Sequence, residues 1–237
     1  MEIDKYNLRA RVYPVIVAFI MPILSILILE SLSVNNLLTF MPLAGVLALV
    51  ALFSSIARAS GKTVEERLFS EWGGAPTTLQ LLYKYSCLNS LVLDKIRNKL
   101  EIVCEGVKFL SKEEENGNVD KATEICEYAV LQLRQLTRDK VKFYMVFNEN
   151  IFYGFFRNLY ALRGFSIFLS ICVVCYALVV VCIDDSRIAS CIWVVILNVI
   201  SVSIMMFFIT KKSIKAAGNS YAKALLEACF MLECTGK

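Results

Sequence analysis

Two clusters of residues in this chain have the composition of a ligand-binding site. The first is Trp72-Gly73-Gly74-Ala75-Pro76-Thr77-Thr78. Paired glycines let the backbone bend sharply and bring its N–H groups close to a ligand, and threonine hydroxyls at the start of a helix favour an anion such as phosphate. The same residues also suit a tight turn between two helices, with Trp72 packed beneath it and Thr77 as a helix cap. Both interpretations stay open.

The second cluster runs from Thr137 to Arg163 and interleaves basic and amide side chains with aromatic ones. Cations hold phosphates while rings stack on bases, so this composition suits a nucleotide or single-stranded nucleic acid. Aromatic and arginine side chains just before an apolar run are equally typical of a membrane-interface belt. A smaller basic cluster, Lys95–Lys99, is either a further phosphate contact or a solvated helix face. The candidate ligand-binding residues are therefore Trp72, Gly73, Gly74, Thr77, Thr78, Lys95, Arg97, Lys99, Arg138, Asn150, Tyr153, Arg157 and Asn158.

The elements that must position these residues include four long apolar runs, Val12–Leu29, Leu37–Ala57, Phe165–Ile183 and Ile188–Ile209. Each run is close to the ~20 residues that an α-helix needs to cross about 30 Å of hydrocarbon, and none contains a charge. Lipid offers no partners for backbone N–H and C=O groups, so the runs must be helical. We therefore predict an all-α, polytopic membrane protein with four transmembrane helices in two pairs and a helical cytoplasmic domain between the pairs.

The runs divide the chain into a tail and first hairpin (1–57), a cytoplasmic helical sensor domain (58–163), a second hairpin (164–210) and a C-terminal amphipathic helix (211–237). In the central domain, the periodicity of apolar residues predicts a short helix from Thr63 and a helix over Leu93–Leu110. A polar loop over Ser111–Asn118 and a long helix capped by Asp120 follow. No strand pattern persists in the sequence.

Basic residues give the orientation. They precede the first and third runs and follow the second and fourth, whereas the short loops within the pairs carry Glu30 on one side and Asp184, Asp185 and Arg187 on the other. Cytoplasmic loops of membrane proteins carry an excess of lysine and arginine, so we expect both termini and the central domain in the cytoplasm. The residues concerned are Lys5, Arg9, Arg11, Arg58, Lys62, Arg67, Arg157, Arg163, Lys211, Lys212 and Lys215.

The composition argues against catalysis. The chain has no histidine, which is the commonest general base and metal ligand, and it has no phosphate-binding glycine loop and no nucleophile elbow. No carboxylate lies within an apolar run, where an ion-coupled transporter needs one. Of the nine cysteines, Cys172 and Cys175 have metal-ligand spacing but lie in mid-span without a second pair, so we expect them to pack as small apolar residues. We expect no enzyme activity, no catalytic residue, no metal and no cofactor.

Three motifs in the central domain resemble a family of small bacterial four-span membrane effectors found beside nucleotidyltransferases in anti-phage loci, in particular the effector of the Hailong system. The resemblance covers roughly Gly61 to Arg163, while the spans match only in number and spacing. The motifs are Trp72-Gly73-Gly74-x-Pro76-Thr77-Thr78, Thr137-Arg138-Asp139 and Glu149-Asn150-x-x-Tyr153-Gly154-Phe155-x-Arg157-Asn158.

The resemblance implies a homo-oligomeric channel in the bacterial inner membrane, with a tetramer as the expected assembly. Its signal would be an oligonucleotide or a cyclic nucleotide made by a cognate nucleotidyltransferase encoded nearby, and the active channel would depolarise the membrane. These properties are expectations that follow from the resemblance alone.

The fourth run carries polar groups that suit a pore. Asn198 and Ser201 are three residues apart and share a helix face, so they either line water or hydrogen-bond to neighbouring helices. Closure would then need an apolar constriction, for which Ile204 and Phe208 are the candidates. The alternatives are a membrane anchor or scaffold without a pore and, less compatible with the uncharged spans, a transporter or membrane enzyme.

Overall fold

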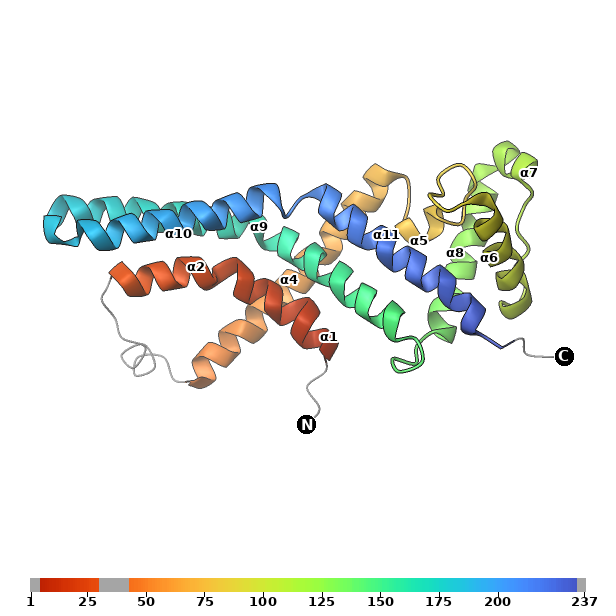
Figure 1. The fold of residues 1–237 in the computed structure, drawn as a ribbon, viewed down its shortest axis with the longest axis horizontal. Helices are drawn as coiled ribbons and strands as arrows, with labels where there is room; N and C mark the ends of the chain where they lie inside the picture. The colour runs from red at the N-terminus through yellow and green to blue at the C-terminus, as the bar shows by residue number, and fades with distance from the viewer. Residues whose placement is uncertain (1–4, 30–42, 234–237) are drawn as a thin grey trace. The chain divides into compact units, whose positions relative to one another are not determined.

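The computed structural model describes residues 5–29 and 43–233 of the chain, and every regular element in these ranges is helical, as predicted (Figure 1). The elements are α1 (Lys5–Asn7), the π-helix η1 (Leu8–Val12), α2 (Tyr13–Leu29), α4 (Leu43–Trp72), α5 (Pro76–Leu79), α6 (Ser90–Val103), α7 (Lys112–Gly117), α8 (Val119–Leu136), α9 (Tyr144–Ile183), η2 (Asp185–Arg187), α10 (Ile188–Phe207), α11 (Lys211–Glu227) and η3 (Ala228–Met231).

The chain folds into two compact units. Unit 1 comprises Met1–Glu65 and Gly154–Ile214, and unit 2 comprises Glu66–Tyr153 and Lys215–Lys237. Compared with the predicted domains, unit 1 takes in short stretches at both ends of the central segment, and unit 2 takes in the C-terminal segment from Lys215. Helices α4 and α9 each contribute residues to both units, so the chain passes from one unit to the other within helix.

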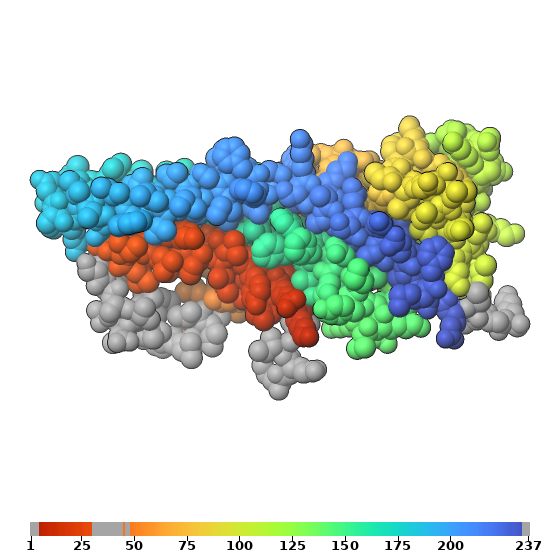
Figure 2. All heavy atoms as spheres, viewed as in Figure 1, coloured from red at the N-terminus to blue at the C-terminus, as the bar shows by residue number. Residues whose placement is uncertain are grey.

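Three helical segments in the described residues are long and apolar enough to cross a membrane: Lys5–Leu29, Tyr144–Ile183 and Asp185–Phe207. They contain the first and third predicted runs and all but the last two residues of the fourth. The second predicted run begins in residues 37–42, which lie outside the described residues, and its remainder is the start of α4. Figure 2 shows an uncovered face of α10. Large apolar side chains of this helix, such as Trp193 and Phe207, are exposed. A surface of this kind fits contact with lipid.

The first proline of α2 determines one contact between helices of unit 1. Proline has no N–H, so Pro14 cannot donate to the carbonyl of Ala10, four residues earlier. The side chain of Asn158 on α9 supplies the missing donor, with its Nδ2 2.7 Å from the Ala10 oxygen. Prolines are tolerated in membrane-embedded helices where a neighbouring helix bonds the freed carbonyl in this way.

The second proline repeats the arrangement. Pro22 leaves the carbonyl of Ala18 without its usual donor, and Ser166 Oγ donates to that oxygen at 2.6 Å. Asn158 and Ser166 are eight residues apart, as are the two prolines. Helix α2 and this part of α9 therefore run parallel and in register, as expected for two hairpins that begin on the same side of a membrane.

Small residues allow this close packing. A Cβ atom at Gly61 on α4 would overlap the amide of Asn158, and a Cβ atom at Gly154 on α9 would lie 3.2 Å from the Cβ of Ala10. Ala10 and Ala57 are themselves fully buried. Because small side chains let helix backbones approach closely, Asn158 can reach the η1 carbonyl.

Arginine side chains in unit 1 bond the carbonyl of Leu29, the last residue of α2, and that of Ile209, two residues beyond α10. At one end, Arg187 Nη1 donates to the carbonyl of Leu29 at 2.7 Å, and its Nε lies 3.6 Å from Asp184. At the other end, Arg163 Nη1 donates to the carbonyl of Ile209 at 3.2 Å. The final carbonyls of a helix have no partner within it, and a cation there also complements the helix dipole.

Unit 2 is built around one apolar core to which α5, α6, α8, η3 and α11 contribute. On α6 and α8 the buried side chains recur every three or four residues, which is the spacing of one helix face. Side-chain caps begin both helices: Asn89 accepts from the Leu91 N–H at 2.9 Å, and Asn118 accepts from the Lys121 N–H at 3.1 Å. The largest fully buried side chains of this core are Leu81, Leu82, Leu93, Ile96, Leu100, Leu133 and Leu225.

Several local predictions were wrong. The loop predicted for Ser111–Asn118 is instead the helix α7, because Ser111 and Glu114 each bond the other's backbone N–H in a capping box. The short helix from Thr63 is not separate, since α4 continues unbroken to Trp72. Helix α6 ends well before Leu110, and Asn118 rather than Asp120 caps α8.

We expect Asn158→Ala to lower the free energy of unfolding by about 1–3 kcal/mol, because it leaves the Ala10 carbonyl unpaired. In a Pro14→Ala background the same substitution should cost much less, since alanine restores the backbone donor. Unfolding by dodecyl sulfate in mixed micelles measures both. Ser166→Ala is the control. Its cost in free energy of unfolding should fall in a Pro22→Ala background, whereas in a Pro14→Ala background it should stay the same within about 0.5 kcal/mol. Equal costs of Asn158→Ala in both backgrounds would contradict this account.

Candidate functional site

The glycine–proline–threonine cluster forms the turn between α4 and α5. Gly73 and Gly74 have φ angles of +82° and +148°, which L side chains rarely adopt. The Gly74 N–H donates to a carbonyl of α4 at 2.8 Å, and the N–H groups of Thr78 and Leu79 donate to the Ala75 carbonyl at 3.0 and 2.9 Å. These amides are therefore bonded to the protein's own backbone.

The side chains of this cluster pack against unit 2. Thr77 and Thr78 are buried, and Arg134 Nη2 donates to Thr77 Oγ1 at 3.3 Å. Trp72 is half-buried, with the Lys215 ammonium 5.6 Å from its ring centroid. The geometry of these residues favours the tight-turn interpretation over an anion site.

Arg97, a candidate phosphate contact, lies in a closed cage at 3 % exposure. Its Nη1 donates to Glu115 at 3.1 Å, and its Nη2 donates to the carbonyl of Leu110 at 2.7 Å. The guanidinium lies 4.3 Å from the ring centroid of Tyr83 and 4.7 Å from that of Phe109. A buried cation needs such pairing. From α6, Arg97 bonds both α7 and the segment that precedes α7, and it does not face a ligand.

The neighbouring lysines differ from Arg97, since Lys95 is exposed and Lys99 is half-buried. Tyr83 completes the cage by donating its hydroxyl to Asp94 at 2.6 Å. Partial burial and this hydrogen bond raise the pKa of the Tyr83 phenol above its ordinary value of 10.0. The phenol therefore stays protonated near neutral pH and keeps its bond to Asp94.

The aromatic and basic cluster is divided between the units. In unit 1, Arg157 forms an ion pair with Glu65, and Asn158 bonds the Ala10 carbonyl. In unit 2, Tyr153 is buried with its ring stacked on Tyr221.

The rest of the cluster is more accessible. Arg138 is exposed and Asn150 is half-buried. The exposed side chains near the start of α9 therefore form the part of this cluster that a soluble ligand can reach.

A pocket of about 460 Å³ opens in unit 2 between the start of α9 and the end of α11. Lys142 and Lys223 supply two cations, and Tyr144 is an exposed aromatic ring. Glu149 and Glu227 also line it, so a ligand with both phosphate and amino groups fits its mixed charge better than a bare polyanion does. Together with Arg138, this pocket offers the cation-and-ring chemistry that the sequence predicts for this region.

The four candidate pore residues, three on α10 and Phe208 directly after it, differ in burial. Asn198 and Ser201 are buried within unit 1, whereas Ile204 and Phe208 are exposed. Asn198 Nδ2 donates to Ser25 Oγ at 2.7 Å and to a carbonyl one turn earlier in α10 at 2.9 Å. The Asn198 Oδ1 atom is buried and has no hydrogen-bond partner among the described residues.

Sequence reasoning missed the partners of these residues. Ser25, Ser166 and Glu115 were not among the candidates, although each bonds a buried polar group. A signal was present for Ser166: the two prolines of α2 free carbonyls eight residues apart, and Asn158 and Ser166 have the same spacing on α9.

Comparison with known proteins gives no match: no family model, no curated protein and no solved structure matches this chain. The function must therefore be argued from the site itself.

Replacing Arg97 by methionine should destabilise unit 2 by about 3–5 kcal/mol, because Glu115 would be left as an unpaired buried carboxylate. Adding Glu115→Leu should recover most of that loss. Chemical unfolding followed by circular dichroism measures the effect. Lys95→Met, at an exposed position two residues away, is the control and should change stability by no more than about 0.5 kcal/mol. If the Arg97→Met variant were stable but bound oligonucleotide more weakly, Arg97 would be a ligand-binding residue and the structural role would be contradicted.

Proposed function

We propose that this protein is a membrane effector of bacterial anti-phage defence: an oligomeric channel in the cytoplasmic membrane, controlled by a nucleotide or oligonucleotide bound to unit 2. The observation that carries the proposal is Asn198. Its side chain is 1 % exposed in a largely apolar helix, and its carbonyl oxygen has no hydrogen-bond partner among the described residues. A passive anchor needs this amide only for its bond to Ser25, which leaves the unpaired oxygen unexplained.

The unpaired oxygen bears on how the helices move. A buried acceptor without a partner costs about 1–3 kcal/mol, and hydrocarbon offers no water to replace the missing bond. An arrangement in which α10 turns Asn198 and Ser201 toward water recovers that cost. The packed arrangement, held by the bond from Asn198 to Ser25, is thus the closed state, and the separated arrangement is the open one.

The exposed face of α10 supports assembly of several copies. Ile204 and Phe208 lie on the exposed surface of unit 1, where a neighbouring copy or lipid covers them. A protomer with four spans encloses little space, so a pore requires copies around an axis, and we propose a tetramer. In this assembly the apolar side chains of α10 form the constriction.

The ligand would act through unit 2. We assign the nucleotide to the pocket between α9 and α11, where Lys142 and Lys223 meet the phosphates and Tyr144 stacks on a base. Helix α9 carries this pocket at its start and a predicted span at its end. A ligand shifts a two-state equilibrium only by its different affinity for the two states, so a ~100-fold preference contributes about 2.7 kcal/mol to gating.

The proposed orientation has four spans, with unit 2 and both termini in the cytoplasm. An impermeant maleimide should label a variant that retains only Cys87 in inside-out vesicles, and one that retains only Cys182 in spheroplasts. Cys87 is exposed in unit 2, and Cys182 is exposed near the turn between α9 and α10. Variants that retain only Cys126 or Cys229 are controls: burial raises both thiol pKa values to about 12, so neither should react before unfolding. Labelling of Cys87 in intact spheroplasts would overturn this orientation.

Current through wild-type protein in planar bilayers tests the channel directly. Asn198→Leu should lower conductance at least tenfold, because leucine gains nothing from water in the separated state. The packed state loses the bond to Ser25 but leaves no unpaired group there, since Ser25 Oγ keeps its bond to the Met21 carbonyl. Ser203→Ala, on the same helix, is the control and should conduct like wild type. Lys142→Gln with Tyr144→Ala should weaken binding of a DNA oligomer or cyclic dinucleotide and leave the open conductance unchanged. The control, Lys112→Gln with Tyr128→Ala, should change neither the binding nor the conductance.

Binding of the oligomer should also weaken steeply with salt, because neutralised phosphates release counterions. If wild-type protein gives no current with or without these probes, the protein is a membrane anchor or scaffold rather than a channel.

A further inference from the structure

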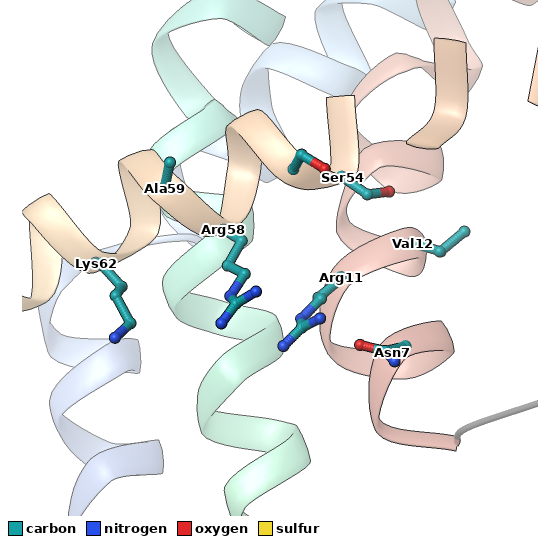
Figure 3. A pocket seen from close by; sticks show the side chains of 8 residues that line it. Asn7, Arg11, Val12, Ser54, Arg58, Ala59 and Lys62 are labelled. Atoms are coloured by element: carbon teal, nitrogen blue, oxygen red, sulfur yellow. The ribbon is translucent and has the colours of Figure 1, made fainter. Parts of the chain in front are cut away.

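Three cations gather at one pocket of unit 1 that the proposed function does not use. Arg11 comes from η1, and Arg58 and Lys62 come from successive turns of α4. The pocket has a volume of about 480 Å³. Figure 3 shows the Arg11 and Arg58 side chains extending toward one another, with Lys62 one turn further along α4.

No carboxylate balances this charge among the residues that line the pocket. None of the ion pairs formed within the described residues involves Arg11, Arg58 or Lys62. The neighbouring acid on α4, Glu65, pairs with Arg157 instead. Like charges that converge without a counterion repel one another, so an anion in the pocket would stabilise the arrangement.

A neutral donor in the wall of the pocket points to the same ligand. Ser54 is 9 % exposed, and its hydroxyl has no hydrogen-bond partner among the described residues. Two guanidinium groups, an ammonium and a hydroxyl offer donors from two helices to one anion. Arginine binds phosphate oxygens in a bidentate manner, which makes a phosphate group the best match.

The pocket lies where the apolar runs begin and end. Val12 and Ser54 line it, and they belong to the first turn of the first predicted run and the last turn of the second. Beyond it, Ile16 on α2 and Leu52 on α4 are exposed apolar side chains that acyl chains can cover. Basic pockets between spans on the cytoplasmic side suit anionic lipid headgroups.

We propose that this pocket binds a phosphodiester group at the level of the membrane interface. An anionic phospholipid and a soluble nucleotide both present that group, so the experiment must distinguish them. The inference does not depend on channel activity, because it concerns binding to unit 1 and uses none of the residues of α10 or of the unit 2 pocket.

The test uses full-length, delipidated protein in a neutral detergent. Native mass spectrometry measures retention of added phosphatidylglycerol against phosphatidylcholine, and a parallel titration measures a DNA oligomer. Arg11→Gln with Arg58→Gln should lower phosphatidylglycerol binding at least tenfold. Arg9→Gln with Arg67→Gln removes two exposed arginines from the same segments outside the pocket and should change binding less than twofold. Loss of oligomer binding alone in the pocket variant would support a soluble phosphodiester instead.

A second variant separates the pocket from surface charge. Ala59→Phe keeps every cation but places a ring at a residue that lines the pocket, so it should also lower binding at least tenfold. Elution volume and thermal unfolding in detergent identify variants that fail to fold. Only folded variants are compared with wild type. The proposal is overturned if Ala59→Phe binds phosphatidylglycerol like wild type or if both arginine pairs lower binding equally. It is also overturned if neither phosphatidylglycerol nor the DNA oligomer binds the two arginine-pair variants differently.

Discussion

The packing of unit 1 depends on two backbone carbonyls that the prolines of α2 leave without donors. In an aqueous protein such carbonyls turn toward water, but in a membrane they must find a partner in the protein. Asn158 and Ser166 provide it, and their spacing requires α9 to lie parallel to α2. Gly61 and Gly154 then have to lack side chains so that the helices approach closely enough.

The two units place buried polar groups differently. In unit 2 the Arg97 cage is fully paired, with a carboxylate, a carbonyl and two aromatic rings around one guanidinium. Such a network specifies one arrangement of α6 and α7. In unit 1 the amide of Asn198 is paired on one side only. The polar network of unit 2 is thus closed, whereas that of unit 1 leaves one buried acceptor without a partner among the described residues.

The sequence was sufficient for the features that depend on length and period. Apolar runs of about 20 residues predicted the three described helical segments that are long and apolar enough to cross a membrane, and the period of apolar residues predicted the all-helical fold. It was insufficient where one local contact determines the secondary structure. At α7, for example, the capping box starts a helix in a run of polar residues that the sequence predicted to be a loop. Site residues were harder still: Arg97 and Asn158 have the chemistry of phosphate and base contacts, yet their partners lie 18 and 148 residues away in sequence and could not be read from it.

The matched register of α2 and α9 also limits how unit 1 can deform. The two bonded positions are eight residues apart on each helix, roughly 12 Å along the axis. Sliding one helix past the other breaks both bonds together, and a shift of one helical turn brings neither donor to a freed carbonyl. Sliding α2 along the unit 1 part of α9 is therefore disfavoured, and these two segments keep one register. A motion within unit 1 that preserves both bonds is a tilt or rotation of another helix, such as α10, against this pair.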